Sequence, residues 1–126
     1  MDKISTPECS RRLLPIKDTL ELLSGKWKLL IIIALHHGDK RFKELQRETE
    51  GITARMLSKE LKELEVNGLV KRTVHDTMPV TVIYSTTEYS RTLNNVIDAL
   101  HEWGLKHRSR IMGTEYVPSE QGSFGN

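Results

Sequence analysis

The segment GITARMLSKELKELEVNGLVKR, residues 51–72, decides the fold because its apolar and charged residues separate at helical spacing. At about 100° per residue, three leucines fall on one face of a helix and three cations on the other. The leucines are Leu57, Leu61 and Leu64, and the cations are Arg55, Lys59 and Lys62. One face is therefore predicted to pack in a core and the other to form a basic surface.

The ends of this helix and the hairpin after it are also marked in the sequence. Thr53 can cap the first turn, and Asn67-Gly68 can end the helix, so it is predicted over residues 54–67. Two runs rich in β-branched residues follow, over residues 69–75 and 80–85, separated by a Thr-Met-Pro turn. A helix followed directly by a β-hairpin is expected.

A shorter helix is predicted just upstream, over residues 42–49, and Gly51 closes it. Two short helices that meet across a tight turn have helix-turn-helix spacing, in which the second helix can enter the major groove of DNA. The hairpin would make the motif a winged one. A solvated amphipathic helix with no ligand is the alternative that the periodicity alone leaves open, since many basic faces serve only solubility.

Length and composition limit the classes of protein. At 126 residues the chain is expected to form one domain, and its net charge of +2 says little about nucleic acid. Between residues 40 and 72, however, nine basic residues stand against six acidic ones. The single cysteine, Cys9, excludes an intrachain disulfide, and neither the N-terminus nor the longest apolar run, residues 29–35, suits a signal peptide or a membrane span. A soluble, cytoplasmic protein with no membrane partner is predicted.

The rest of the chain is expected to be organised around two further helical regions. Pro15 can open a helix over residues 16–23, after a flexible segment at residues 1–14. The run KWKLLIIIALHH, residues 26–37, has the isoleucines of a buried strand, but its length between two glycines favours a central core helix. The folded domain is expected to cover residues 15–112, and a flexible tail residues 113–126.

The last helix is predicted to run from Thr87 to Met112, which is roughly 38 Å at 1.5 Å per residue. One apolar stripe follows it, made of Leu93, Val96, Ile97, Leu100, Trp103, Gly104, His107 and Ile111. A helix of that length exposes more apolar surface than a domain of this size can cover. The stripe therefore predicts a homodimer interface, with a fully internal core as the alternative.

Taken together, GKWKLLIIIAL, RFKELQRETEGITARMLSKELKELEVNGLVKR, Pro79 with VIYSTT, and Trp103 resemble the HxlR-type winged helix regulators, which are related to the MarR class. The resemblance covers about residues 16–103. It implies a bacterial homodimer whose terminal helices form the interface. Each subunit would place one helix in a major groove and one hairpin beside the flanking backbone.

The resemblance also implies which residues meet double-stranded DNA. Lys26, Lys28, Lys40 and Arg41 would lie near phosphates, and Arg72 would begin the wing. The reading helix would present Thr53, Arg55, Met56, Ser58, Lys59 and Lys62. Among these, Arg55 and Lys59 are expected to read bases, whereas Met56 would either touch a thymine methyl or pack under the preceding helix.

Two departures from the family pattern concern regulation. The family commonly has a cysteine directly before the proline that opens the first helix, and here that residue is Leu14. Cys9 lies five residues earlier, so no redox role is carried over to it. Ser90 and Thr86 replace a usual glycine and a common leucine, both outside the DNA-reading region. The sequence identifies no effector.

An enzyme has little support in this sequence, because no nucleophile elbow, P-loop, HExxH or paired-cysteine motif occurs. The histidines do not share faces in a way that suits a metal, so neither a metal nor a cofactor is expected. The predicted fold is α+β, mainly α: a winged helix-turn-helix with a two-stranded wing and terminal dimerisation helices. The predicted function is sequence-specific regulation of transcription as a DNA-bound homodimer, with a winged-helix protein interaction module as the alternative.

Overall fold

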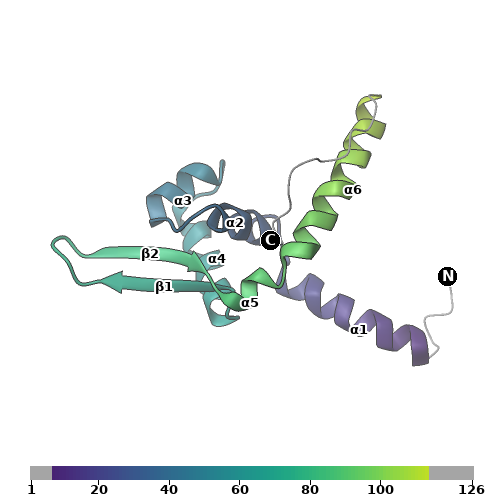
Figure 1. Ribbon diagram of the computed structural model, residues 1–126, viewed down its shortest axis with the longest axis horizontal. Helices are drawn as coiled ribbons and strands as arrows, with labels where there is room; N and C mark the ends of the chain where they lie inside the picture. The colour runs from purple at the N-terminus through teal and green to yellow at the C-terminus, as the bar shows by residue number, and fades with distance from the viewer. Residues whose placement is uncertain (1–6, 114–126) are drawn as a thin grey trace.

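The computed structural model describes residues 7–113, with side chains from residue 11 onward. Its elements in chain order are α1 (Pro7–Leu22), α2 (Lys28–His36), α3 (Phe42–Glu48), α4 (Ala54–Val66), β1 (Val70–His75), β2 (Thr81–Thr86), α5 (Glu88–Arg91) and α6 (Asn94–Met112). Helices α2 to α5 and the β-hairpin form a body, and α1 and α6 leave it as two arms on the side away from the hairpin tip (Figure 1). The fold is the mainly helical winged helix-turn-helix that the sequence predicts.

Helix α2 is the centre of the body. Ile31 and Ile32 are fully buried, and the core around them includes Leu45 of α3 and Leu57 of α4. The run of isoleucines is therefore a helix, as its length indicates, and not the strand that its β-branched residues would also permit. A helix that is apolar on several sides is typical of a position surrounded by other elements.

The predicted signals at both ends of α4 are confirmed. The Thr53 hydroxyl accepts a hydrogen bond from the backbone N–H of Met56 at 3.1 Å, which satisfies one donor that a first helical turn leaves free. At the other end Gly68 adopts a φ of 77°, a left-handed conformation that costs little without a Cβ atom. These caps fix where the helix begins and ends.

Strands β1 and β2 pair antiparallel from Val70 opposite Thr86 to His75 opposite Thr81, and together with their turn they form the wing. Strand β2 begins one residue later than predicted. A further rung comes from the segment between α2 and α3, where Lys40 and Tyr84 exchange both backbone hydrogen bonds, at 3.0 and 2.8 Å. This rung attaches the wing to the entrance of α3.

The predicted boundaries of α1 and of the last helix are wrong. Helix α1 begins at Pro7 rather than Ile16, so residues 7–14, expected to be flexible, are helical and Pro15 lies inside the helix. The last helix is broken into α5 and α6 at Thr92 and Leu93. The Leu93 N–H bonds to the Ser90 carbonyl three residues back, at 3.0 Å, in place of the four-residue spacing of an α-helix. The continuous part, α6, is therefore about 28 Å long.

Two predicted features, the C-terminal tail and Cys9, fall partly or wholly outside the described atoms. The predicted flexible tail falls almost entirely on residues 114–126, and the Cys9 side chain also lies outside the described atoms. None of the helices in residues 7–113 combines the length and hydropathy needed to cross a membrane. Over the same part of the chain, no cluster of three or more His, Cys, Asp or Glu side chains is placed to hold a metal ion.

Candidate nucleic-acid interface

Helix α4 divides its side chains between core and solvent as its periodicity predicts. Leu57, Leu61 and Leu64 are buried and belong to the same core as the buried residues of α2 and α3. On the solvent side the exposed residues are Arg55, Ser58, Lys59 and Lys62. Thr53 is exposed at the helix start, and Met56 keeps 40% of its surface accessible, so it lies on the surface rather than beneath α3. The solvent face offers both hydrogen-bond donors and a methyl-rich side chain.

The basic face of α4 continues onto the base of the wing. Ser58 and Lys62 of α4 line one groove together with Arg72 of β1 and Tyr84 of β2. Arg72 and Tyr84 are opposite one another in the hairpin register, so the groove crosses from helix to sheet. The structure thus brings together three predicted contact residues that are up to fourteen positions apart in the sequence.

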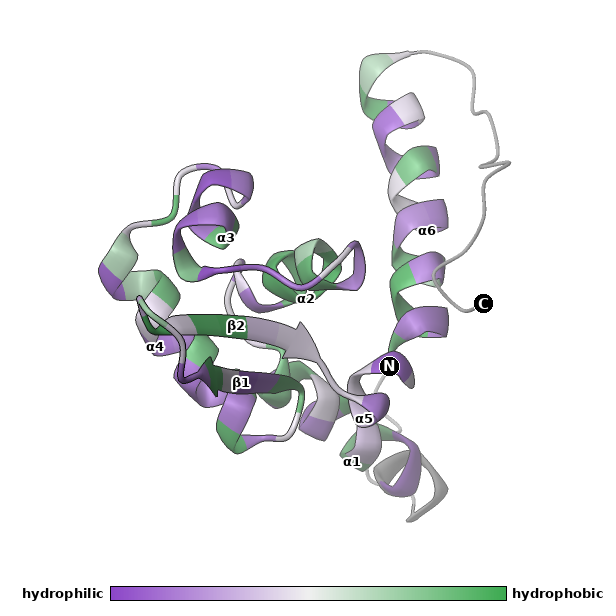
Figure 2. Ribbon diagram, turned by 60° about the vertical axis from the view of Figure 1, so that its left-hand side comes forward, coloured by the Kyte–Doolittle hydropathy of each residue, from purple (hydrophilic) through white to green (hydrophobic). Residues whose placement is uncertain are grey.

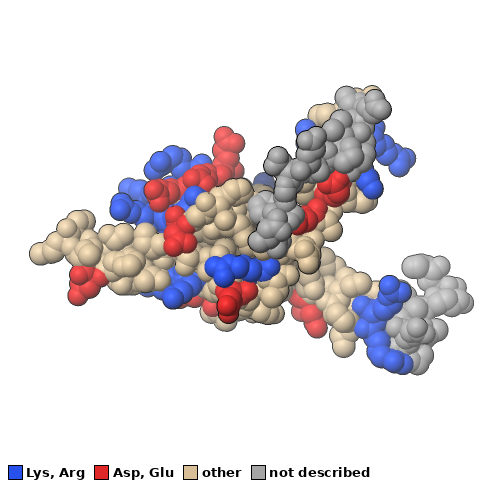
Figure 3. Space-filling model, viewed as in Figure 1, with Lys and Arg blue, Asp and Glu red and all other residues tan. Residues whose placement is uncertain are grey.

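Helix α3 adds cations that the sequence analysis does not select. Lys43 and Arg47 line a surface hollow with Gln46 and Ile52, immediately before α4 begins. Their spacing of four residues, which places two side chains on the same face of a helix, is the signal in the sequence that could have identified them. Figure 3 shows Lys and Arg side chains gathered over α3, interleaved with acidic ones. Arg41 is exposed at the start of this helix.

Lys28 is not available to phosphates, and its predicted role is wrong. Only 6% of the residue is accessible, and its Nζ lies 2.6 Å from Glu60 Oε1 and 2.7 Å from Glu63 Oε1. Burial lowers the pKa of Lys28, but the hydrogen bonds to Glu60 and Glu63 outweigh it, so the pKa is raised overall. The hydrogen bond from Lys28 in turn lowers the pKa of Glu63. The ammonium group is charged, but both of its ion-pair partners are carboxylates of the same chain, Glu60 and Glu63.

The two other lysines expected near phosphates differ from each other. Lys26 is exposed, and its Nζ lies 4.6 Å from the centre of the Trp27 ring, a cation–π contact that leaves the charge accessible. The Lys40 side chain is mostly buried, and its Nζ lies 3.4 Å from a carboxylate oxygen of Glu48. Lys26 therefore keeps its predicted place on the surface, whereas the structure argues against a phosphate contact by Lys40.

The wing carries its cations only at its base. Lys71 and Arg72 lie near the start of β1, and from Thr73 to Val80 there is no Lys or Arg but one acidic residue, Asp76. In Figure 3 the tip is correspondingly free of blue atoms. Met78 at the turn is almost fully exposed. Phosphate neutralisation by the wing is therefore restricted to the part next to α4.

The predicted interface stripe divides between the body and solvent. Ile97 is only 2% accessible and belongs to the core of the body, so assigning Ile97 to a dimer interface is wrong, whereas Leu93 is partly buried against that core. The rest lies on the accessible side of α6: Val96, Leu100, Trp103, His107 and Ile111 are exposed, and Gly104 is partly buried. Trp103 is 63% accessible and stacks on His107 at 5.0 Å between ring centres.

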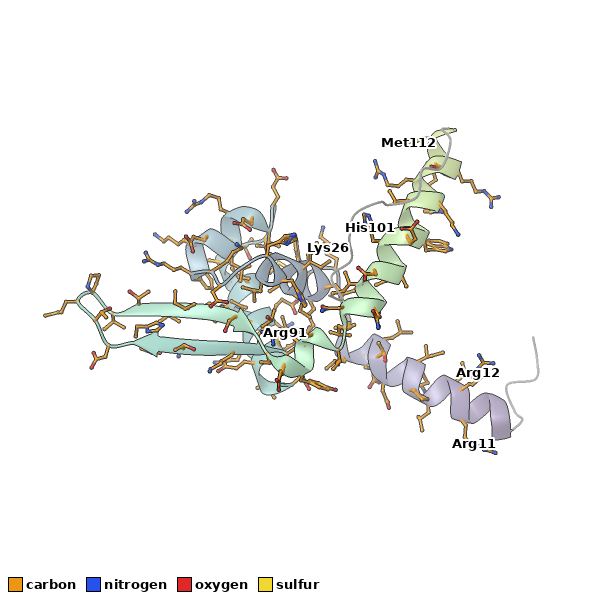
Figure 4. The ribbon with its side chains drawn as sticks, in the orientation of Figure 1. Arg11, Arg12, Lys26, Arg91, His101 and Met112 are labelled. Atoms are coloured by element: carbon orange, nitrogen blue, oxygen red, sulfur yellow. The ribbon has the colours of Figure 1, made fainter. Side chains whose placement is uncertain are left out.

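Both arms present apolar side chains that the described residues, 7–113, leave exposed. On α1 these are Leu14, Ile16 and Leu20, each more than half accessible. Figure 2 shows α6 standing apart from α2 and α3, with apolar and polar turns along its length. Figure 4 shows Arg11 and Arg12 at the far end of α1 and His101 and Met112 along α6, all well away from the wing. The arms and the basic face thus lie in separate parts of the molecule.

Comparison with known proteins agrees with this geometry. Residues 22–112 match the family described as HxlR-like helix-turn-helix. The HTH-type transcriptional regulator YtcD of Bacillus subtilis is 40% identical over 106 residues, which are 84% of each chain, and its crystal structure superposes with a TM-score of 0.73 over 75% of this chain and 97% of that one.

Two further solved structures are similar. The redox regulator HypR in its reduced form is 39% identical, with a TM-score of 0.73 over 79% of this chain and 98% of that one. A transcriptional regulator of the MarR family from Enterococcus faecalis V583 is 31% identical, with a TM-score of 0.72 over 90% and 99%. These relatives are regulators and not enzymes. A family match over most of the chain, on a winged helix with an exposed basic face, shows that the chain belongs to the HxlR-like helix-turn-helix family of transcriptional regulators.

Proposed function

We propose that this regulator binds specific DNA sequences as a homodimer, with α4 in the major groove and the base of the wing at the flanking backbone. The observation that carries the proposal is a set of four exposed cations on α4 and β1, namely Arg55, Lys59, Lys62 and Arg72, of which Lys62 and Arg72 line one groove. Several cations on one surface raise the affinity for a phosphate backbone, because each neutralised phosphate releases condensed counterions.

Within this surface the roles are expected to differ by position. A recognition helix enters the groove by its N-terminal end, so Arg55 and Lys59 in the first turns of α4 are the candidates for base edges. Arg72 at the base of the wing is a candidate for the backbone alone. Lys26, Arg41, Lys43 and Arg47 are further exposed cations on the body that can add phosphate contacts.

The homodimer part of the proposal is supported by the arms. Leu100 and Trp103 of α6, and Leu20 of α1, expose apolar surface of a size that a lone soluble domain seldom leaves uncovered. Two copies related by a two-fold axis would bury these faces against each other and place two α4 helices on one side. We therefore assign dimerisation to α1 and α6 and DNA contact to the body.

Titration of duplex DNA tests the proposal. The protein is mixed with fragments flanking its own gene and with scrambled fragments, at two salt concentrations. We expect tighter binding to one flanking fragment, with an affinity that falls by about 0.9 logarithmic units per neutralised phosphate for each tenfold rise in salt. Arg55→Glu should abolish this binding, and Arg91→Glu, the same charge change at an exposed position of α5, should leave most of it.

Two results would overturn the proposal. Binding that ignores salt would show that the basic surface does not neutralise phosphates. Failure to bind any flanking fragment better than scrambled DNA would favour a winged-helix module that pairs with an acidic protein surface. Because HypR is described as a redox regulator, the same titration under oxidising conditions is informative, although no sensing residue is assigned in this chain.

A further inference from the structure

The ion-pair network around Lys28 joins helices α2 and α4 and lies beside a cleft that α1 also lines. Lys28 is the first residue of the central helix α2, and its two carboxylate partners, Glu60 and Glu63, come from the recognition helix α4. The cleft beside this network is lined by Lys28 and Glu63 and also by Asp18 and Glu21 of α1. The network therefore lies where α2 and the recognition helix α4 come together, next to the arm α1.

Two ion pairs to the same helix restrain that helix more than a single ion pair would. Glu60 and Glu63 are one helical turn apart, on the flank of α4 between its buried leucines and its basic face. Bonds at 2.6 and 2.7 Å from a single ammonium group to both carboxylates restrain rotation of α4 about its own axis. Apolar packing does this less well, because dispersion and hydrophobic contacts have little directionality.

Rotation of this helix matters for reading bases. A group at the helix surface lies about 5–6 Å from the axis, so a rotation of about 20° moves it by about 2 Å. A hydrogen bond to a base edge is confined to a donor–acceptor range of about 0.5 Å. A small error in the rotation of α4 would therefore misplace Arg55 and Lys59 while leaving their charge near the phosphates.

We propose that Lys28 is a positioning residue for the DNA-reading helix: through Glu60 and Glu63 it sets the rotation of α4, and thereby the ability of the protein to discriminate between DNA sequences. The assignment rests on the proposed function. It also makes a claim about the DNA-free protein, because the network orders α4 whether or not DNA is present.

A double substitution separates positioning from stability. Lys28→Met removes the ammonium alone and leaves the buried Glu60 carboxylate uncompensated, so it destabilises the fold and confuses the two effects. Lys28→Met combined with Glu60→Met replaces the buried pair by apolar residues of similar length. Such replacements are often neutral or stabilising, so the double variant is expected to melt within a few degrees of the wild type.

Three measurements on the full-length double variant then decide. Hydrogen exchange without DNA should be about tenfold faster at the amides of α4 and unchanged in α2. The ratio of operator to scrambled-DNA affinity should fall about tenfold. The salt slope should stay as in the wild type, whereas a phosphate contact by Lys28 would flatten it by about one charge per subunit. Lys59→Met is the matched control: it should reduce DNA binding without changing exchange in α4.

A stable double variant with wild-type exchange in α4 would overturn the proposal, and so would a flattened salt slope. If the wild type discriminates no sequence at all, the proposed function fails, and the exchange measurement still decides the role of Lys28. If the double variant does not fold, Glu63→Ala removes the more accessible of the two anchors. That variant should fold, exchange faster in α4 and discriminate less; unchanged exchange there would contradict the assignment.

Discussion

Leucines in the body and leucines in the arms have opposite surroundings, although both belong to apolar stripes at helical spacing. Leu57 of α4 has no accessible surface, whereas Leu100 of α6 is 51% accessible and Leu20 of α1 is more exposed still. The body covers its stripes because α2, α3, α4 and the wing pack on several sides of one another. Among the described residues the arms lack such neighbours, so periodicity identifies an apolar face without identifying what covers it.

The largest effect is expected from a charge placed on an arm. Leu100→Asp should convert the proposed dimer into a monomer, because it would bury a carboxylate without a partner in the proposed interface. Operator affinity should fall by about 10²–10⁴-fold, because in a monomer the binding of one recognition helix no longer holds a second one close to the DNA. Light scattering at micromolar concentration measures the mass. Val66→Asp, an equal change at an exposed site of the body, should keep the wild-type mass.

The next effect compares leucine deletion in body and arm within that monomeric Leu100→Asp background. Leu57→Ala should lower the free energy of unfolding by about 2–5 kcal/mol, because it removes buried methyl groups and leaves a cavity. Leu20→Ala should change it by no more than about 0.5 kcal/mol, as at other exposed positions. Denaturant titration gives both values. An equally costly Leu20→Ala would show that α1 packs on its own body.

A smaller and more specific effect concerns the DNA surface of the body. Arg55→Ala should reduce discrimination between operator and mutated operator by about 1–3 kcal/mol, the value of one good bidentate base contact. Arg72→Ala should weaken both DNAs by a similar factor and flatten the salt slope by about one charge per subunit. Titration of each variant against both sequences at two salt concentrations measures this. If Arg55→Ala weakened binding to both DNAs equally, this would show that Arg55 contacts phosphates and not base edges.

The smallest effect is expected from His36, at the end of α2 near α5. Burial, and then the charges of His37 and Arg91, lower the pKa of His36 below 6.5. The unfolded chain therefore takes up a proton first as the pH falls, and the stability contributed by the neutral imidazole is lost as the pH drops through that value. Solvent screening keeps the effect modest because the residue is partly accessible.

Replacement of this histidine by a neutral residue measures the effect. Between about pH 7.5 and about pH 5.5, the wild type should lose more stability than His36→Gln, which does not titrate in this range. Denaturant midpoints at both pH values give the comparison. Parallel curves for the two proteins would show that His36 titrates alike in the folded and unfolded chains.

Local sequence determined most of the secondary structure. The leucine spacing of α4, its Thr53 cap and the glycine after it each act within a few residues, so the sequence predicts that helix to within one residue at its C-terminal end. The hairpin and its turn follow from β-branched residues and a proline. Membership of the winged helix class needs little more, because these elements occur in one uninterrupted order.

Tertiary structure alone decided which charged and which apolar side chains remain accessible to solvent. Lys28 and Lys59 are both lysines on helices, yet Lys28 is buried by partners 32 and 35 positions away, and no local pattern encodes such a pairing. Ile97 belongs to a stripe whose later members face solvent, yet it is buried in the core that residues of α2, α3 and α4 form. Helix propensity and hydrophobic periodicity depend on residues that are close in the sequence. Burial depends on which distant surfaces pack together, so the burial of a residue is decided only when the whole chain has folded.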